Sequence, residues 1–171
     1  ENKRENFLCK HCNIQYQSIG AEGFVEIDKF QLCKIKNDPN FWEDKDVYLG
    51  LDLSQSDDNT AVAMVTLFEG KIYCMVWGFI PGGKIKAKSE REKVDYNKLI
   101  RDGVCIATGT EEDEIIDYKE VEDFVLDLPK RYGVNIVQLG YDRYNAISSV
   151  QKFESAEEPI ECVEIKQHSS V

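Results

Sequence analysis

The sequence has little positive charge and no long apolar run. Its 171 residues include 21 Lys and Arg against 32 Asp and Glu, which gives a net charge of −11. This balance argues against a broad positive surface for nucleic acid, so any such contact must be local. No apolar stretch reaches the roughly 18 residues that a membrane span requires. The first ten residues, ENKRENFLCK, lack the apolar core of a signal peptide, and we expect a cytosolic protein.

Histidine is also scarce, and the cysteines do not follow the usual spacing of a zinc site. Cys9 and Cys12 flank His11 in a C-x-x-C pattern, but Cys33 follows without a second ligand pair. Structural zinc is therefore not expected, and His168 is given no role. Three other cysteines lie inside apolar runs and are predicted to be buried free thiols of a reducing compartment: Cys74, Cys105 and Cys162.

The chain length and its 42% hydrophobic content suit one compact domain. Residues 1–46 have mixed charge and no sustained periodicity, apart from apolar residues at positions 24, 27, 30 and 32. We interpret this stretch as a linker with one short helix. The pattern changes at Val47, so the predicted domain covers residues 47–171.

A three-stranded antiparallel meander opens this domain. The strands are predicted from the runs VYLGLDLS, TAVAMVTLF and KIYCMVWGFI. The first connection is the turn-rich QSDDN, and the second is the two-residue turn Glu69-Gly70.

Helices and strands then alternate. Residues 94–100 are predicted to be a short helix, VCIAT a strand, and Asp117 the N-cap of a longer helix whose last turn Pro129 kinks or shortens. VNIVQLGYD is predicted to be a buried strand, RYNAISSVQKF a helix, and PIECVEI a last strand. The apolar faces of the two later helices comprise Val121, Phe124, Val125, Leu128 and Tyr132, and Ala146, Ile147, Val150 and Phe153. The order predicts an α/β fold with a mixed sheet and helices on its faces.

Two aspartates terminate or interrupt apolar strands, where an unpaired carboxylate is costly to bury. Asp52 lies in YLGLDLS and Asp142 in QLGYDRYNA. If their strands are neighbours, the carboxylates meet at one edge of the sheet and form a divalent-metal site. Each residue also fits a structural alternative: Asp52 as the cap of the following turn, and Asp142 as the N-cap of a helix starting near Arg143.

The ordered series of motifs resembles the nuclease domain of phage terminase large subunits. It comprises LGLDLSQSDDNTAVAMV, an aromatic-rich hairpin strand, IDYKEVEDFV and VQLGYDRYNA. The resemblance implies an RNase H-like fold and a metal-dependent endonuclease that cuts concatemeric double-stranded viral DNA during genome packaging. It makes Asp52 and Asp142 the catalytic residues and the ligands of two Mg²⁺ or Mn²⁺ ions.

The resemblance extends to the N-terminal residues. ENFLCKHCNIQYQS is similar to the stretch that leads from the packaging ATPase domain into the linker, while the sequence contains no G-x-x-x-x-G-K-[ST] loop. The family's third acid lies on a later helix that we do not find here. We therefore expect a C-terminally incomplete nuclease core, inactive by itself, from a protein of the host bacterial cytoplasm. The implied partners are double-stranded DNA, the ATPase domain of the same polypeptide, the portal protein and the terminase small subunit.

Weaker candidates surround the two acids. Asp57 and Asp58 lie in the first hairpin and supplement the metal ligands or are solvated turn residues. Arg143, Tyr144 and Asn145 follow the second acid and are placed to orient it or to contact DNA. The basic stretch GGKIKAKSEREK contains three lysines at alternate positions, Lys84, Lys86 and Lys88. In an extended backbone their side chains would point in the same direction and could contact phosphate. A solvated loop is the alternative.

Three other functions fit part of the pattern. Another RNase H-like nuclease, such as a resolvase or an integrase core, would use the same acids and metals. GLDLSQSDDNTAVAMV also resembles the first phosphate-binding hairpin of actin-like and sugar-kinase ATPases. A non-enzymatic RNase H-like scaffold is the third alternative, and the acidic charge favours it.

Overall fold

The structure is a computed structural model that describes residues 27–36, 38–55, 58–143 and 145–166. The chain divides into two compact units, Glu1–Asn37 and Asp38–Val171. In the first unit, helix α2 (Ile27–Leu32) confirms the short helix predicted near the N-terminus, and the Phe30 and Leu32 side chains on it are exposed. The remaining elements belong to the second unit.

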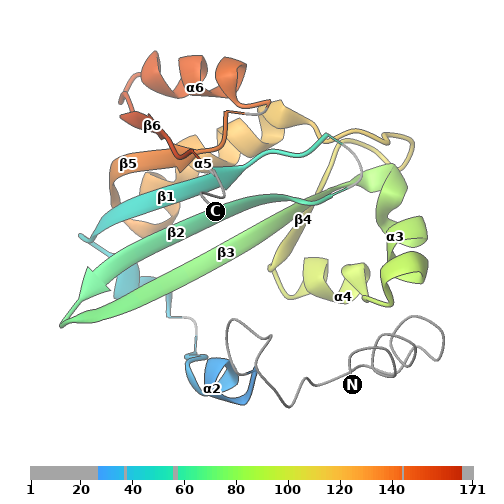
Figure 1. Cartoon of the computed structure of the whole chain (residues 1–171), viewed down its shortest axis with the longest axis horizontal. Helices are drawn as coiled ribbons and strands as arrows, with labels where there is room; N and C mark the ends of the chain where they lie inside the picture. The colour runs from blue at the N-terminus through green and yellow to red at the C-terminus, as the bar shows by residue number, and fades with distance from the viewer. Residues whose placement is uncertain (1–26, 37, 56–57, 144, 167–171) are drawn as a thin grey trace, which may run out of the picture. The chain divides into compact units, whose positions relative to one another are not determined.

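The second unit contains one mixed sheet and the helices that pack on it (Figure 1). Its strands are β1 (Asp46–Asp52), β2 (Thr60–Phe68), β3 (Lys71–Pro81), β4 (Cys105–Thr108), β5 (Asn135–Tyr141) and β6 (Cys162–Glu164). Its α-helices are α3 (Ile85–Glu92), α4 (Tyr96–Arg101), α5 (Tyr118–Tyr132) and α6 (Ile147–Glu154), with short 3-10 helices η1 (Pro39–Trp42) and η2 (Gly82–Lys84).

The order of the strands in the sheet is β4-β3-β2-β1-β5-β6. The pairs β1–β2 and β2–β3 are antiparallel, so the predicted meander is confirmed. The pairs β3–β4, β1–β5 and β5–β6 are parallel. Only β2 therefore runs opposite to the other described strands, and β1, β3, β4, β5 and β6 all end at one edge, which we call the C-terminal edge.

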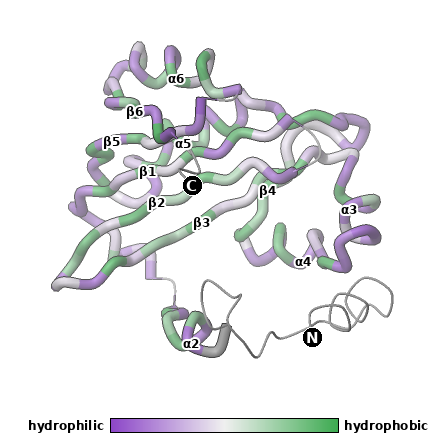
Figure 2. Tube along the Cα trace, viewed as in Figure 1, coloured by the Kyte–Doolittle hydropathy of each residue, from purple (hydrophilic) through white to green (hydrophobic). Residues whose placement is uncertain are grey.

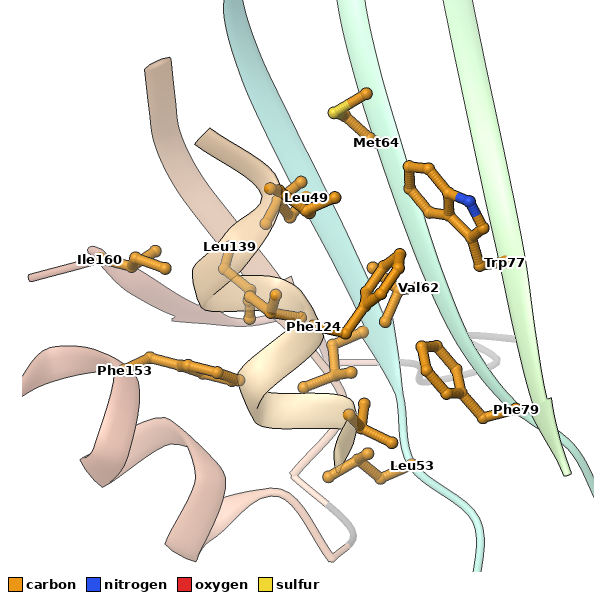
Figure 3. Packing of buried hydrophobic residues seen from close by; sticks show 14 of the residues in the cluster. Leu49, Leu53, Val62, Met64, Trp77, Phe79, Phe124, Leu139, Phe153 and Ile160 are labelled. Carbon is orange, nitrogen blue, oxygen red and sulfur yellow. The ribbon is translucent and has the colours of Figure 1, made fainter. Parts of the chain in front are cut away.

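One face of the sheet packs against α5 and α6 to form the main core. Phe124 of α5 stacks edge-on against Trp77 and Phe79 of β3, with ring centroids 5.0 and 5.2 Å apart. Phe153 of α6 and Leu139 of β5 are both fully buried in the same cluster (Figure 3). Aromatic and aliphatic burial of this extent is the main source of stability for the fold.

The opposite face is apolar but more exposed. Hydrophobic stretches recur along β2 and β3 (Figure 2), and Tyr48, Val76 and Val163 keep 53%, 50% and 39% of their surface. At the corner formed by β3 and β4, a smaller core buries Ile80 and Cys105 against Tyr96 at the start of α4.

Several local predictions differ from the structure. Residues 82–92 form a 3-10 turn and helix α3 instead of an extended arm. Helix α5 continues beyond Pro129 to Tyr132, because Gly133 adopts a left-handed conformation and its N–H bonds to the Pro129 carbonyl. Ile147 is 55% exposed, since α6 starts there and its buried face comprises Ser149, Val150 and Phe153.

The cysteine prediction is confirmed for Cys105, which is buried, whereas Cys162 is half-buried and Cys74 is exposed. Cys74 is exposed because it alternates onto the open face of β3, away from Trp77. All three are free thiols. Burial raises the pKa of the Cys162 thiol to about 11, so this thiol is protonated at neutral pH.

The second unit begins at Asp38, whereas the sequence placed the start of the domain at Val47. Trp42 keeps only 4% of its surface and lies in the main core, and Phe41 packs against that core. The intervening segment is also tied to the C-terminal end of α5 by a hydrogen bond from the Asp44 N–H to the Gly133 carbonyl, 2.8 Å long. Periodicity could not reveal this segment because it contributes two aromatic residues from a single 3-10 turn.

Candidate active site

The two aspartates predicted to form the site lie at the ends of neighbouring strands. β1 and β5 pair in parallel, and Leu51 lies opposite Tyr141 at the end of the ladder. Asp52 and Asp142 are the next residues of the two chains. The strand arrangement that the metal-site interpretation required is therefore present, and adjacent strands lie about 4.8 Å apart.

Asp52 faces away from the main core. Val47, Leu49 and Leu51 of β1 are buried under the helices, so alternation places Asp52 on the open face, where it is exposed. Asp142 is partly buried. A carboxylate that remains accessible to solvent is open to a cation and its water molecules.

The alternative in which Asp142 caps a helix does not hold. Helix α6 starts at Ile147, and its N-cap is Ala146, without a side-chain capping bond. Between Asp142 and the helix the chain makes a turn in which Asn145 adopts a φ of 62°. Asp142 thus belongs to the loop that leaves the strand and not to the first turn of the helix.

The segment that follows Asp52 is held by several neighbours. Leu53 is buried in the main core, and the Ser54 N–H donates to the Thr60 hydroxyl over 2.9 Å. The Ser54 carbonyl accepts from the Thr60 and Tyr118 hydroxyls. These bonds fix the backbone immediately after Asp52 relative to β2 and α5.

Two further contacts reach Gln55. Its carbonyl accepts from the Ile116 N–H at 2.9 Å, and its side-chain amide donates to the Asn145 Oδ1 at 3.3 Å. The second contact joins the loop after Asp52 to the loop after Asp142. Sequence reasoning had named Asn145 but not Gln55, because nothing local in the sequence connects the two positions.

A polar cluster on α3 and α4 contacts the end of the β1–β2 loop, at Asn59. The Asn59 side-chain amide donates to the Tyr96 hydroxyl at 2.8 Å, and that hydroxyl donates to Glu92 Oε2 at 2.5 Å. Glu92 also pairs with Arg91 and with the buried Lys88. The hydrogen bonds from Tyr96 and Arg91 lower the pKa of the Glu92 carboxyl. No local pattern predicts this cluster, because its members come together only when α3 and α4 fold back toward β2.

The three lysines predicted to bind phosphate do not share one direction. In a helix, residues two apart point to different faces. Lys84 pairs with Glu114 at 3.2 Å, while Lys88 keeps only 3% of its surface and pairs with Glu92. Lys86 alone of the three is exposed. The geometric reason for grouping them is wrong because residues 85–92 are helical.

The remaining candidate residues are either exposed or outside the described part of the chain. Asp58 is exposed in the loop between β1 and β2, and Arg143 is exposed directly after Asp142. Asp57, Tyr144 and His168 lie outside the described residues, as does the motif from Cys9 to Cys12. Within the described part of the chain, no group of three or more His, Cys, Asp or Glu residues is placed to hold a metal ion.

Comparison with known proteins identifies the family. The sequence matches, over residues 1–171, the family described as "Terminase large subunit, endonuclease domain". The chain belongs to this family. No curated protein matches it.

A solved structure shows the same fold. The crystal structure of the HK97 bacteriophage large terminase matches with a TM-score of 0.69 at 18% sequence identity. The match covers 86% of this chain and 29% of the HK97 chain, so this chain spans less than a third of that terminase. The predicted RNase H-like α/β fold of the terminase nuclease is confirmed.

Membership in the terminase endonuclease family favours the nuclease interpretation over the actin-like ATPase and over a resolvase. It also supports the assignment to a phage terminase nuclease that the motif series implied. Among the described helices, none is long and apolar enough to cross a membrane.

Proposed function

We propose that this chain is the nuclease part of a large terminase, and that it cuts concatemeric double-stranded viral DNA in the bacterial cytoplasm with two Mg²⁺ or Mn²⁺ ions. Asp52 and Asp142 are the proposed metal ligands and catalytic residues. The observation that carries the proposal is the β1–β5 register, which sets the two aspartates at the ends of adjacent parallel strands. Family membership supports the reaction class.

The residues present fit a hard divalent cation. Mg²⁺ takes oxygen ligands and is commonly held by one or two carboxylates together with water and substrate phosphate. Two carboxylates on an open edge satisfy that requirement, and a further acid from outside this chain, implied by the resemblance, would complete a two-ion site. When bound, the ions supply an activated water and neutralise the charge that develops on the leaving 3′ oxygen.

The chain's own residues have defined tasks in this proposal. Asp52 and Asp142 hold the cations, and the bonded segment from Leu53 to Gln55 keeps Asp52 in place. Lys86 and Arg143 are the exposed cations proposed for the DNA phosphates. The ATPase domain, portal protein and terminase small subunit are the proposed partners.

The test is Asp52→Asn in the polypeptide that carries this chain. The change keeps the size of the side chain and removes its charge, so nicking of plasmid DNA in Mn²⁺ should fall at least about 100-fold, as expected for the loss of a metal ligand. The folded state should be retained, as judged by circular dichroism. The matched control is Asp46→Asn, which makes the same change at the exposed aspartate that begins the same strand and should change the rate little.

Undiminished cutting by Asp52→Asn would refute the assignment. A chain that binds neither Mn²⁺ nor DNA would instead support the non-enzymatic scaffold. Nucleotide-dependent stabilisation without Mn²⁺ binding would support the actin-like alternative.

A further inference from the structure

We propose that Gln55 and Asn145 form a positioning pair that sets the separation of the Asp52 and Asp142 carboxylates. The proposal rests on the proposed function, because it assigns these two residues to the same metal site. Their side chains connect the two loops that carry the aspartates, with Gln55 Nε2 3.3 Å from Asn145 Oδ1.

The Gln55 side of the pair is anchored. The preceding Leu53 is buried, Ser54 is bonded to Thr60 and Tyr118, and the Gln55 carbonyl accepts from Ile116. Gln55 therefore projects from a backbone that β2 and α5 hold in place, and its exposed side chain lies at the C-terminal edge.

The Asn145 side lies in the loop between β5 and α6. The β1–β5 ladder ends at Tyr141, and α6 starts only at Ile147, so Asp142 lies in the loop between them. Asn145 adopts a φ of 62°, a left-handed conformation that asparagine tolerates better than other non-glycine residues. This turn brings its side chain toward Gln55 of the β1–β2 loop.

The hydrogen bond between Gln55 and Asn145 therefore joins the segment that follows β1 to the segment that follows β5. Without it, the Asp142 loop would keep its attachment to β5 and α6 but lose a side-chain contact with the segment after Asp52. A two-ion site depends on carboxylate positions held within a fraction of an ångström. Removing a residue that orients a metal ligand typically weakens metal binding by about 10- to 100-fold.

The experiment is a double-mutant cycle in the polypeptide that carries this chain, with Gln55→Ala, Asn145→Gly and the double variant. Glycine at 145 keeps the left-handed backbone and removes only the amide. The matched control is Gln151→Ala, an exposed glutamine of α6 whose backbone carbonyl accepts from the Ser155 N–H and hydroxyl. Mn²⁺ affinity is measured by calorimetry and global stability by urea unfolding.

Each single variant should weaken Mn²⁺ binding about tenfold, and the double variant should be no weaker than the weaker single one. Stability and the control variant should be nearly unchanged. If the losses of Mn²⁺ affinity in the two single variants multiply in the double variant, the residues act separately and the proposal is wrong. Unchanged Mn²⁺ affinity in both single variants would also overturn it. Asp52→Asn, measured in parallel, reports on the proposed function itself.

Hydrogen exchange gives a readout that does not need the metal. If the side chains bridge the loops, Asn145→Gly should speed amide exchange in residues 53–59, and Gln55→Ala should speed it in residues 142–146. Exchange that changes only in the mutated loop would overturn the proposal, even in a chain that fails to bind Mn²⁺.

Discussion

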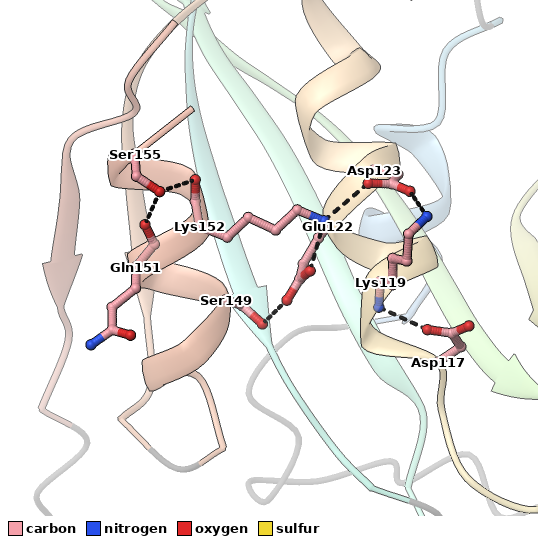
Figure 4. Close-up of polar contacts among 8 residues, drawn as sticks. All are labelled: Asp117, Lys119, Glu122, Asp123, Ser149, Gln151, Lys152 and Ser155. Atoms are coloured by element: carbon pink, nitrogen blue, oxygen red, sulfur yellow. Dashed lines mark hydrogen bonds and ion pairs between the residues drawn. The ribbon is translucent and has the colours of Figure 1, made fainter. Parts of the chain in front are cut away.

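At the scale of single residues, one lysine and one serine connect the two helices of the main core. Lys152 of α6 pairs with Glu122 and Asp123 of α5 at 2.9 and 3.1 Å, and the Ser149 hydroxyl donates to Glu122 at 2.6 Å (Figure 4). The ion pairs are partly exposed and contribute little by themselves. The buried hydrogen bond from Ser149 to a charged acceptor is the stronger contact.

We therefore expect Ser149→Ala to lower the free energy of unfolding by about 1.5–3 kcal/mol, the range for a hydrogen bond to a charged group. Urea denaturation at neutral pH measures the change. The control is Ser148→Ala, its exposed neighbour on the same helix, which makes the same change in helix propensity. Equal effects of the two substitutions would contradict a role for the Glu122 contact.

At the scale of elements, α3 and α4 attach to the sheet through a small core and a polar relay. Ile80 and Cys105 provide the apolar part of this attachment. The relay runs from Asn59 through the Tyr96 hydroxyl to Glu92, which Lys88 and Arg91 neutralise. Burial raises the pKa of the Tyr96 hydroxyl, so it stays protonated and acts as a donor.

Tyr96→Phe should lower the free energy of unfolding by about 1–3 kcal/mol at neutral pH, because two hydrogen bonds are lost and the Asn59 amide loses its acceptor. This loss of unfolding free energy should depend on pH. The pKa of Glu92 is lowered in the folded state, so its contribution is present above the ordinary value of about 4.3 and is lost as pH falls through the folded value.

The difference between Tyr96→Phe and the unmodified chain should therefore shrink as the pH is lowered from 6 toward 3. Urea unfolding across that range measures it. Tyr132→Phe is the control, since burial raises the pKa of the Tyr132 hydroxyl and the neighbouring charge is the cation Arg131, which lowers it. A loss of unfolding free energy in Tyr96→Phe that stays constant down to pH 3 would show that the Tyr96 hydroxyl stabilises the fold independently of Glu92.

At the scale of the whole molecule, the second unit depends on residues before its first strand. Trp42 lies in the main core, and Lys45 sits over the Phe41 ring at 4.5 Å from its centroid. The folding unit should thus start near Asp38, and the length of chain retained at this end should decide its stability.

We expect residues 38–171 to unfold in one cooperative transition, and residues 47–171 to be less stable by at least about 3–5 kcal/mol, the cost of losing a buried tryptophan. Chemical unfolding followed by circular dichroism compares the two chains. Trp42→Ala in residues 38–171 separates the side chain from the rest of the segment. Equal stability of the two truncated chains would show that the unit starts at the first strand.

Part of the candidate site followed from the sequence. An aspartate at the end of an apolar strand is visible locally, so Asp52 and Asp142 were found before their strands were placed. The lysines of α3 were grouped wrongly, because a polar, basic stretch has no clear periodicity and its backbone conformation depends on the sheet corner against which it packs.

The sequence by itself determined the meander, the long helix α5 and the place of two aspartates at the ends of apolar strands, because turn chemistry, capping and the spacing of apolar residues act over a few positions along the chain. The tertiary structure decided what lies next to what. It placed β5 beside β1, buried Lys88 behind Glu92 and brought Gln55 to Asn145. Contacts of this kind join residues far apart in sequence, and only the packing of whole elements around a shared core selects them.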